Sequence, residues 1–296
     1  MSQKFNYGGQ AVIEGVMMRG RKAAVTAVRR PAGDLALDIQ PISAIYNGLM
    51  RRIPLLRGII VLIEAMVLGI KSLLFSASVS LEEEEEELSK KSMWLMVAAA
   101  LLLAVGLFFL APLFLTKLAN PLIPSSLIFH LIEGVIRLAF FVAYLWVISL
   151  LPDIKRVFTY HGAEHMTVNA LEAGVPMEIE DIRKHSTAHV RCGTSFIFIV
   201  LVIAIVVFAF IGRQSLLLMI LSRIFLIPLI AGISYEITYF GARHSHNSLI
   251  RAVLAPGLWL QSLTTGKPDD SQLEVAITAL NKAVEIDETG EAQAPS

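Results

Sequence analysis

One uninterrupted apolar stretch, TSFIFIVLVIAIVVFAFIG at residues 194–212, decides the fold class of this chain. It carries no charge, and it is close to the roughly 20 apolar residues that a helix needs to cross the hydrocarbon core of a bilayer. Three more stretches have a similar character, at residues 93–115, 127–151 and 216–240. We therefore expect a mainly α-helical, polytopic membrane protein with four transmembrane helices, arranged as two hairpins at residues 93–151 and 194–240.

The composition agrees with a membrane protein. Of the 296 residues, 55% are hydrophobic and 17% are charged, whereas an average soluble domain is about 25% charged. The formal net charge is zero, which argues against a nucleic-acid-binding protein held by bulk charge. A single cysteine, Cys192, excludes an internal disulfide framework.

A fifth apolar stretch, at residues 53–79, carries three charges. Arg57, Glu64 and Lys71 are seven residues apart and so share one helical stripe. Each charge at the centre of a lone span costs about 2.5–3.5 kcal/mol. We expect this segment to form an interfacial or re-entrant helix rather than a span.

The basic residues predict the topology. With four spans, nearly all Lys and Arg side chains outside the lipid fall on the side that holds both termini, and the opposite side holds Lys117 and Arg213. Positive charges favour the cytoplasmic side. Both termini are therefore expected to be cytoplasmic.

The segments outside the spans have distinct patterns. Residues 1–52 read as a small cytoplasmic β unit, with strands in AVTAVRR and LALDIQPI around a Pro-Ala-Gly-Asp turn. Residues 80–92 form an acidic linker, and residues 152–193 a His-rich helical segment. The tail, residues 241–296, contains an amphipathic helix at residues 271–286.

The string His161-Gly162-Ala163-Glu164-His165 suggests a metal site. On a helix the two histidines are one turn apart and can bind one ion, and Glu164 could activate water as a general base. This is the inverted zincin pattern, which predicts a divalent metal, zinc above all. The alternative for His161 and His165 is an ordinary exposed or capped helix face.

Further candidates lie downstream. His189 and Cys192 would share a face with His185 if residues 185–192 were helical, and Glu236 is a downstream carboxylate. His189 or Glu236 would supply the third ligand, and Cys192 is a further ligand candidate, although a buried inert thiol is the alternative for it. Basic side chains near these positions would bind substrate, namely Arg191, His244 and His246.

Ionisable residues also occur within the predicted spans. His130, Glu133 and Arg137 lie on one side of the second span, and Arg223 lies in the fourth. Such residues face the bundle interior and are functional candidates. Mutual neutralisation of Glu133 and Arg137 is the simpler explanation.

At GGQAVIEGVMMRG, YHGAEH, HVRCGTSF and GISYE the chain resembles the YqhQ family of bacterial membrane proteins, over most of residues 6–266. That family is described as predicted metal-dependent enzymes. The resemblance implies a bacterial inner-membrane protein with a metal site, but supplies no substrate. The motif positions that it implies are Glu14, His161, Glu164, His165, Arg191, Cys192 and Glu236.

Three functions compete. The leading hypothesis is a membrane metal-dependent hydrolase, such as a peptidase, with a cytoplasm-facing site at the bilayer surface. The second is a non-enzymatic accessory or scaffold factor that binds other membrane proteins during their insertion or assembly, using the amphipathic helix and the cytoplasmic domain. The third is a small transporter built on Glu133 and Arg137. We expect contact with membrane lipid and no nucleic-acid partner, and the sequence leaves the oligomeric state open.

Overall fold

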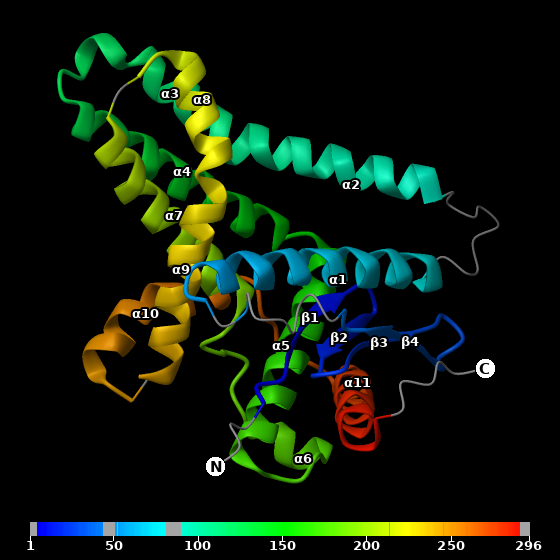
Figure 1. Cartoon of the computed structure of the whole chain (residues 1–296). Helices are drawn as coiled ribbons and strands as arrows, with labels where there is room; N and C mark the ends of the chain where they lie inside the picture. Colours follow the sequence, from blue (N-terminus) through cyan, green and yellow to red (C-terminus); the bar gives the residue numbers. More distant parts are fainter. Residues whose placement is uncertain are drawn as a thin grey trace.

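The structure, a computed structural model, describes residues 5–43, 51, 53–80, 90–212, 214–244 and 246–290. Helices dominate, and a small antiparallel sheet lies near the N-terminus (Figure 1). This confirms the expected fold class of a mainly α-helical membrane-type protein with an N-terminal β unit. The expected acidic linker at residues 80–92 lies largely outside the described residues.

The sheet is a four-stranded meander in the order β1-β2-β3-β4. Its strands are β1 (Gly8–Val12), β2 (Gly15–Arg19), β3 (Ala23–Arg29) and β4 (Leu35–Pro41). The strands β3 and β4 are the two expected from the sequence. The strands β1 and β2 were not expected, because the glycines in them resemble loop residues. Val12 pairs with Gly15, and Glu14 between them has φ 51°, a left-handed conformation that is uncommon for a residue other than glycine.

Helices cover both faces of the sheet, so that β3 is buried along most of its length. On one face, Val16 and Val25 pack with α5 (Pro152–Ala173) and α11 (Asp270–Thr289). On the other face, Thr26 Oγ1 donates a hydrogen bond to Ser72 Oγ of α1 (Leu56–Ser80), at 2.9 Å. The tail helix α11 is amphipathic as expected, and its apolar face lies in this core, with Leu273 and Leu280 fully buried. That face is therefore not available to bind another protein in this structure.

Four helical segments of the described chain are long and apolar enough to cross a membrane. They are Leu56–Ser80, Trp94–Leu118, Ser126–Ile148 and Gly193–Ile211. The second consists of α2 (Lys90–Val105), a π-helix (Gly106–Leu110) and α3 (Ala111–Leu118), and the others are α1, α4 (Ser126–Ile148) and α7 (Gly193–Ile211). Large apolar side chains on them are exposed, Phe210 by 88%, as contact with lipid requires.

The expected span at residues 216–240 differs from the structure. It forms two helices, α8 (Leu216–Phe225) and α9 (Ile227–Arg243), bent by 46°. Pro228 lies in the first turn of α9 and has no N–H to continue the helix from α8, which accounts for the break.

Helix α1 is long and apolar enough to cross a membrane. The sequence instead predicted an interfacial or re-entrant helix at residues 53–79. Two of the three charges behind that expectation are paired: Glu64 lies 2.7 Å from Arg19 and 3.1 Å from Arg51, and Arg57 pairs with Glu236 of α9. The third, Lys71, is exposed. Paired charges lower the cost of burial, so the charge stripe by itself no longer excludes a span. The interfacial position of this helix stays a prediction.

Candidate metal centre

Helix α5 carries both histidines of the HGAEH string. Pro152 occupies its first turn and Gly174 ends it in a left-handed conformation, as is common at helix N- and C-termini respectively. One helical turn separates His161 from His165, and their ring centroids are 4.4 Å apart. The spacing in sequence therefore becomes a shared face, as expected.

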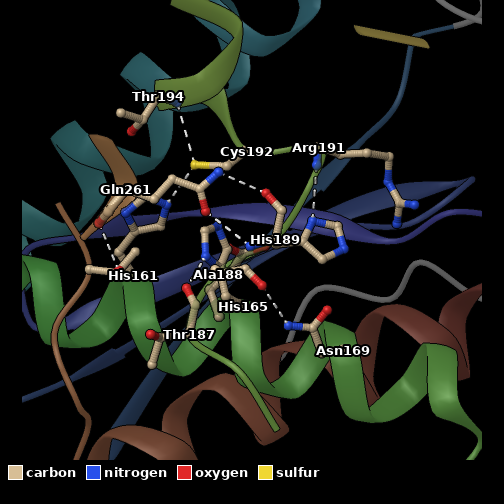
Figure 2. Close-up of polar contacts among 12 residues, drawn as sticks. His161, His165, Asn169, Thr187, Ala188, His189, Arg191, Cys192, Thr194 and Gln261 are labelled. Atoms are coloured by element: carbon tan, nitrogen blue, oxygen red, sulfur yellow. Dashed lines mark hydrogen bonds and ion pairs between the residues drawn. The ribbon is translucent and has the colours of Figure 1, made fainter. Parts of the chain in front are cut away.

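Backbone carbonyls orient both imidazole rings. His161 Nδ1 donates to Thr264 O at 2.8 Å, and His165 Nδ1 donates to Thr187 O at 2.6 Å (Figure 2). A carbonyl oxygen only accepts hydrogen bonds, so each Nδ1 carries a proton, and Nε2 is the ring nitrogen that can bind an ion. Hydrogen bonds of this kind orient histidine ligands in metalloproteins.

Cys192 completes the group. It is the residue before the first turn of α7, and Thr194 N–H donates to its Sγ at 3.4 Å. The same sulfur lies 3.4 Å from His161 Nε2, and Figure 2 shows it facing the His161 ring. The partial positive charge at a helix N-terminus favours negative charge on this sulfur.

Ligand atoms of His161, His165 and Cys192 all lie within 4.8 Å of one another. Among the described residues, this is the group of His, Cys, Asp or Glu side chains with three or more members that could hold a single metal ion. Two imidazole nitrogens and one sulfur form a donor set that suits zinc, with a fourth position for water or substrate. The residues therefore fit the ion that the sequence suggested.

Glu164 lies beside this group. Its side chain is 6% exposed, and Oε2 is 3.4 Å from His165 Nε2. A carboxylate at this position can accept a proton from a water molecule near the three ligand atoms. The general-base role proposed from the sequence is geometrically available.

His189 is close to the group but outside it. Its ring centroid is 5.7 Å from that of His165, and its Nε2 is 3.6 Å from Glu172 Oε2. Gln261 holds its backbone, accepting from the His189 N–H and donating to its carbonyl, each at 2.9 Å. The segment leading to Cys192 is irregular rather than helical, so the shared helical face expected for residues 185–192 is wrong.

Glu236 does not join the histidines. Its carboxylate pairs with Arg57 and accepts a hydrogen bond from Leu55 N–H at 3.0 Å. The expected downstream carboxylate ligand is instead a link between α9 and α1. The sequence could not predict that Glu236 pairs with Arg57, because the two residues lie in helices far apart along the chain.

Of the three residues expected to bind substrate, one lies near the metal-capable group and two do not line the cavity beside it. Arg191 pairs with Glu172 and lines a cavity beside the metal-capable group. His244 stacks on Phe240, with ring centroids 4.2 Å apart, and its Nδ1 donates to Phe240 O at the end of its own helix. His246 is exposed. Neither histidine lines that cavity, and their role in binding substrate stays a prediction.

Glu172 is an ionised anchor for this loop. Burial alone would raise the pKa of its carboxyl, but hydrogen bonds from His189 and Arg191 lower that pKa to about 2. The loop that carries Cys192 is thus tied to α5 by charge as well as by Gln261.

The intramembrane polar residues form a separate cluster. Glu133 lies 3.2 Å from His130 and pairs with Arg137 and Arg223, all buried. Arg137 Nε also donates to Phe108 O in the π-helix, at 2.9 Å, where the wider helical turn leaves a carbonyl available. This cluster links α4, α8 and the π-helix, which favours neutralisation and packing over a transport path.

Several residues that build the site carried no sequence signal. Thr187 and Thr264 contribute through backbone carbonyls, which any residue could provide. Gln261, which lies between the loop and α7, also donates to Ser195 Oγ at 2.6 Å. Nothing in its neighbourhood in the sequence distinguishes it from a surface residue.

A cavity of about 680 Å³ opens beside His161. Thr194 and Phe196 of α7 line it, together with residues from β1, α1 and α9. The metal-capable group therefore has access to a space large enough for an organic ligand.

A family model described as "Protein of unknown function (DUF1385)" matches residues 53–286. The chain is also 36% identical over 301 residues to a Bacillus subtilis (strain 168) protein, "Uncharacterized protein YqhQ", an alignment that covers 96% of this chain and 94% of that protein. No solved structure matches.

Proposed function

This chain belongs to the DUF1385 family, and we propose that it is a membrane hydrolase that uses one divalent metal ion, held by His161, His165 and Cys192. Zinc suits this donor set. The site faces the cytoplasm in this proposal, at the end of α7 that the positive-inside rule assigns to that side.

One observation carries the proposal. Both Nδ1 atoms donate to backbone carbonyls, so Nε2 is the ring nitrogen left for an ion, and one ligand atom each from His161, His165 and Cys192 lies within 4.8 Å of the others. A capped or exposed helix face would not require two backbone carbonyls to orient both rings on successive turns. Pre-orientation of ligands by such bonds is typical of metal sites.

In this proposal the residues around the ion have separate roles. Glu164 accepts the proton of the attacking water at Oε2, which lies 3.4 Å from His165 Nε2. The Thr187 and Thr264 carbonyls hold both imidazole rings in place through Nδ1. A bound divalent ion would supply Lewis acidity, making water more acidic and polarising the oxygen of the bond to be cleaved.

A structural metal site is the competing function. Structural zinc sites have four protein ligands, whereas catalytic sites keep an open position. Three ligand atoms in the described residues and a cavity beside His161 favour the catalytic alternative. The accessory-factor hypothesis also loses one of its two expected docking surfaces, since the apolar face of α11 is buried.

The experiment compares Glu164→Gln with His165→Ala in full-length protein. His165→Ala should lose the metal, because it removes a ligand. Glu164→Gln should keep near-stoichiometric metal and yet fail to restore function in a deletion strain, since general-base catalysis contributes about 10²–10⁴-fold in rate. A metal-loaded Glu164→Gln protein that restores function would refute the hydrolase and favour a structural ion.

A further inference from the structure

A second cavity, of about 530 Å³, adjoins the one beside His161. The two share residues of their walls, including Gln10 of β1, Val61 and Ala65 of α1, and Tyr235 and Tyr239 of α9. Arg191, next to the candidate ligand Cys192, lines both. The two cavities are therefore adjacent, and together they are called the trough.

Arginines gather at the far end of this trough. They come from three separate parts of the chain and are Arg19, Arg21, Arg51, Arg57 and Arg191. Three carboxylates pair with members of this set: Glu64 with Arg19 and Arg51, Glu236 with Arg57, and Glu172 with Arg191.

Arg21 is the member of this set whose side chain pairs with no carboxylate in the described part of the chain. Its guanidinium lies over the Phe5 ring, 5.3 Å from the centroid. Its backbone N–H, rather than its side chain, binds Asp287. Arg21 thus brings to the trough a positive charge that an anion would neutralise. Guanidinium groups match the oxygens of phosphate in geometry as well as charge.

Part of the wall between the arginines and His161 is apolar. Val61, Leu62 and Ala65 come from α1, and Phe196 comes from α7. Both helices are long and apolar enough to span a membrane. A ligand in this trough would therefore contact apolar surface that belongs to membrane-type helices while its charged group lies among the arginines.

We infer that the trough binds a phosphate group among these arginines, and that the phosphate belongs to a membrane lipid. This deepens the proposed function, on which it rests for the reaction at the His161 end of the trough. The binding step itself needs no metal, so it can be tested separately.

The test uses full-length protein in an uncharged detergent, with dioctanoyl phosphatidic acid as the probe and calorimetry as the readout. Arg21→Gln removes one positive charge that lines the trough, from an exposed side chain. Lys22→Gln is the matched control: it removes the same charge from the adjacent exposed residue, whose Nζ donates to Asp287 O instead and which does not line the trough.

We expect Arg21→Gln to weaken binding by about tenfold or more, as loss of a charged hydrogen bond does, and Lys22→Gln to leave it nearly unchanged. Equal weakening in both variants would show general attraction to a basic surface and would overturn the inference. Dioctanoylglycerol, which lacks the phosphate, should not bind measurably.

Two further arms separate the sources of the result. Glycerol 1-phosphate carries the phosphate without the chains, and binding as tight as that of the lipid would overturn the assignment to a membrane lipid. His165→Ala should bind the probe as the wild type does. Binding lost in His165→Ala but kept in Arg21→Gln would assign the phosphate to the metal, overturning the arginine site while the proposed hydrolase stands.

Discussion

Replacing Gly162 with alanine should damage the metal site without touching a ligand. A Cβ at this position would lie 1.9 Å from the Gly266 carbonyl oxygen, whereas ordinary contacts begin near 3.4 Å. The obstacle is backbone rather than a flexible side chain, so α5 and the segment before α11 must move apart by about 1.5 Å.

The displaced segment is the one that orients His161. Gly266 N–H donates to Phe158 O at 2.7 Å, and Thr264 O accepts from His161 Nδ1 two residues earlier. Overpacking of this kind costs about 1–3 kcal/mol of stability. Loss of the partner that orients a histidine ligand typically lowers metal affinity by about 10–100-fold. We expect both effects in Gly162→Ala.

Gly193→Ala is the matched control. Like Gly162, Gly193 lies in a helix and directly follows a candidate ligand, but a Cβ there meets no atom within 4 Å. Thermal unfolding and competition of the purified proteins with a metal chelator measure the two effects. A Gly162→Ala protein with the stability and metal affinity of Gly193→Ala would refute the argument that this close backbone approach orients His161.

Other changes give further predictions. Glu133→Ala leaves Arg137 and Arg223 buried without their shared carboxylate, and thermal unfolding in detergent should show a loss of about 3–5 kcal/mol; a loss below 1 kcal/mol would contradict the cluster's packing role. Asp269 begins α11 with a reciprocal pair of bonds to Gln272, so Asp269→Ala should cost about 1 kcal/mol in chemical unfolding, and no change would mean that the tail helix does not contribute to the stability of the sheet. Because the pKa of Glu172 is lowered from 4.5 to about 2, the stability it contributes is fully present above pH 4.5 and is lost as the pH falls toward 2. Glu172→Gln should show a weaker pH dependence in this window, and an unchanged profile would contradict the pairing with His189 and Arg191.

The sequence predicted the parts of the fold that depend on local pattern. Long apolar runs gave the spans, and the spacing of Leu273 and Leu280 gave the tail helix and its buried face. It did not predict that this face covers the sheet, because contacts between residues so far apart leave no periodic signal. The break at Leu226 was missed, although Pro228 was a visible reason for it.

The candidate site was predictable to the same extent. The i,i+4 spacing on a helix predicted that His161 and His165 lie together, and Cys192, a further ligand candidate, lies near them. The choice among third ligands was not predictable, since Glu236 is occupied by Arg57 and His189 by Glu172. Such competition depends on which helices are neighbours, and the sequence alone did not place α1 beside α9.

X-ray absorption spectroscopy of the purified, zinc-loaded protein tests the central claim most directly, because it counts ligand types around the ion. The proposal predicts one sulfur at about 2.3 Å and two imidazole nitrogens at about 2.0–2.1 Å, with the sulfur signal lost in Cys192→Ser. A zinc environment without sulfur, or a wild-type protein that binds no zinc, would contradict a metal centre formed by His161, His165 and Cys192.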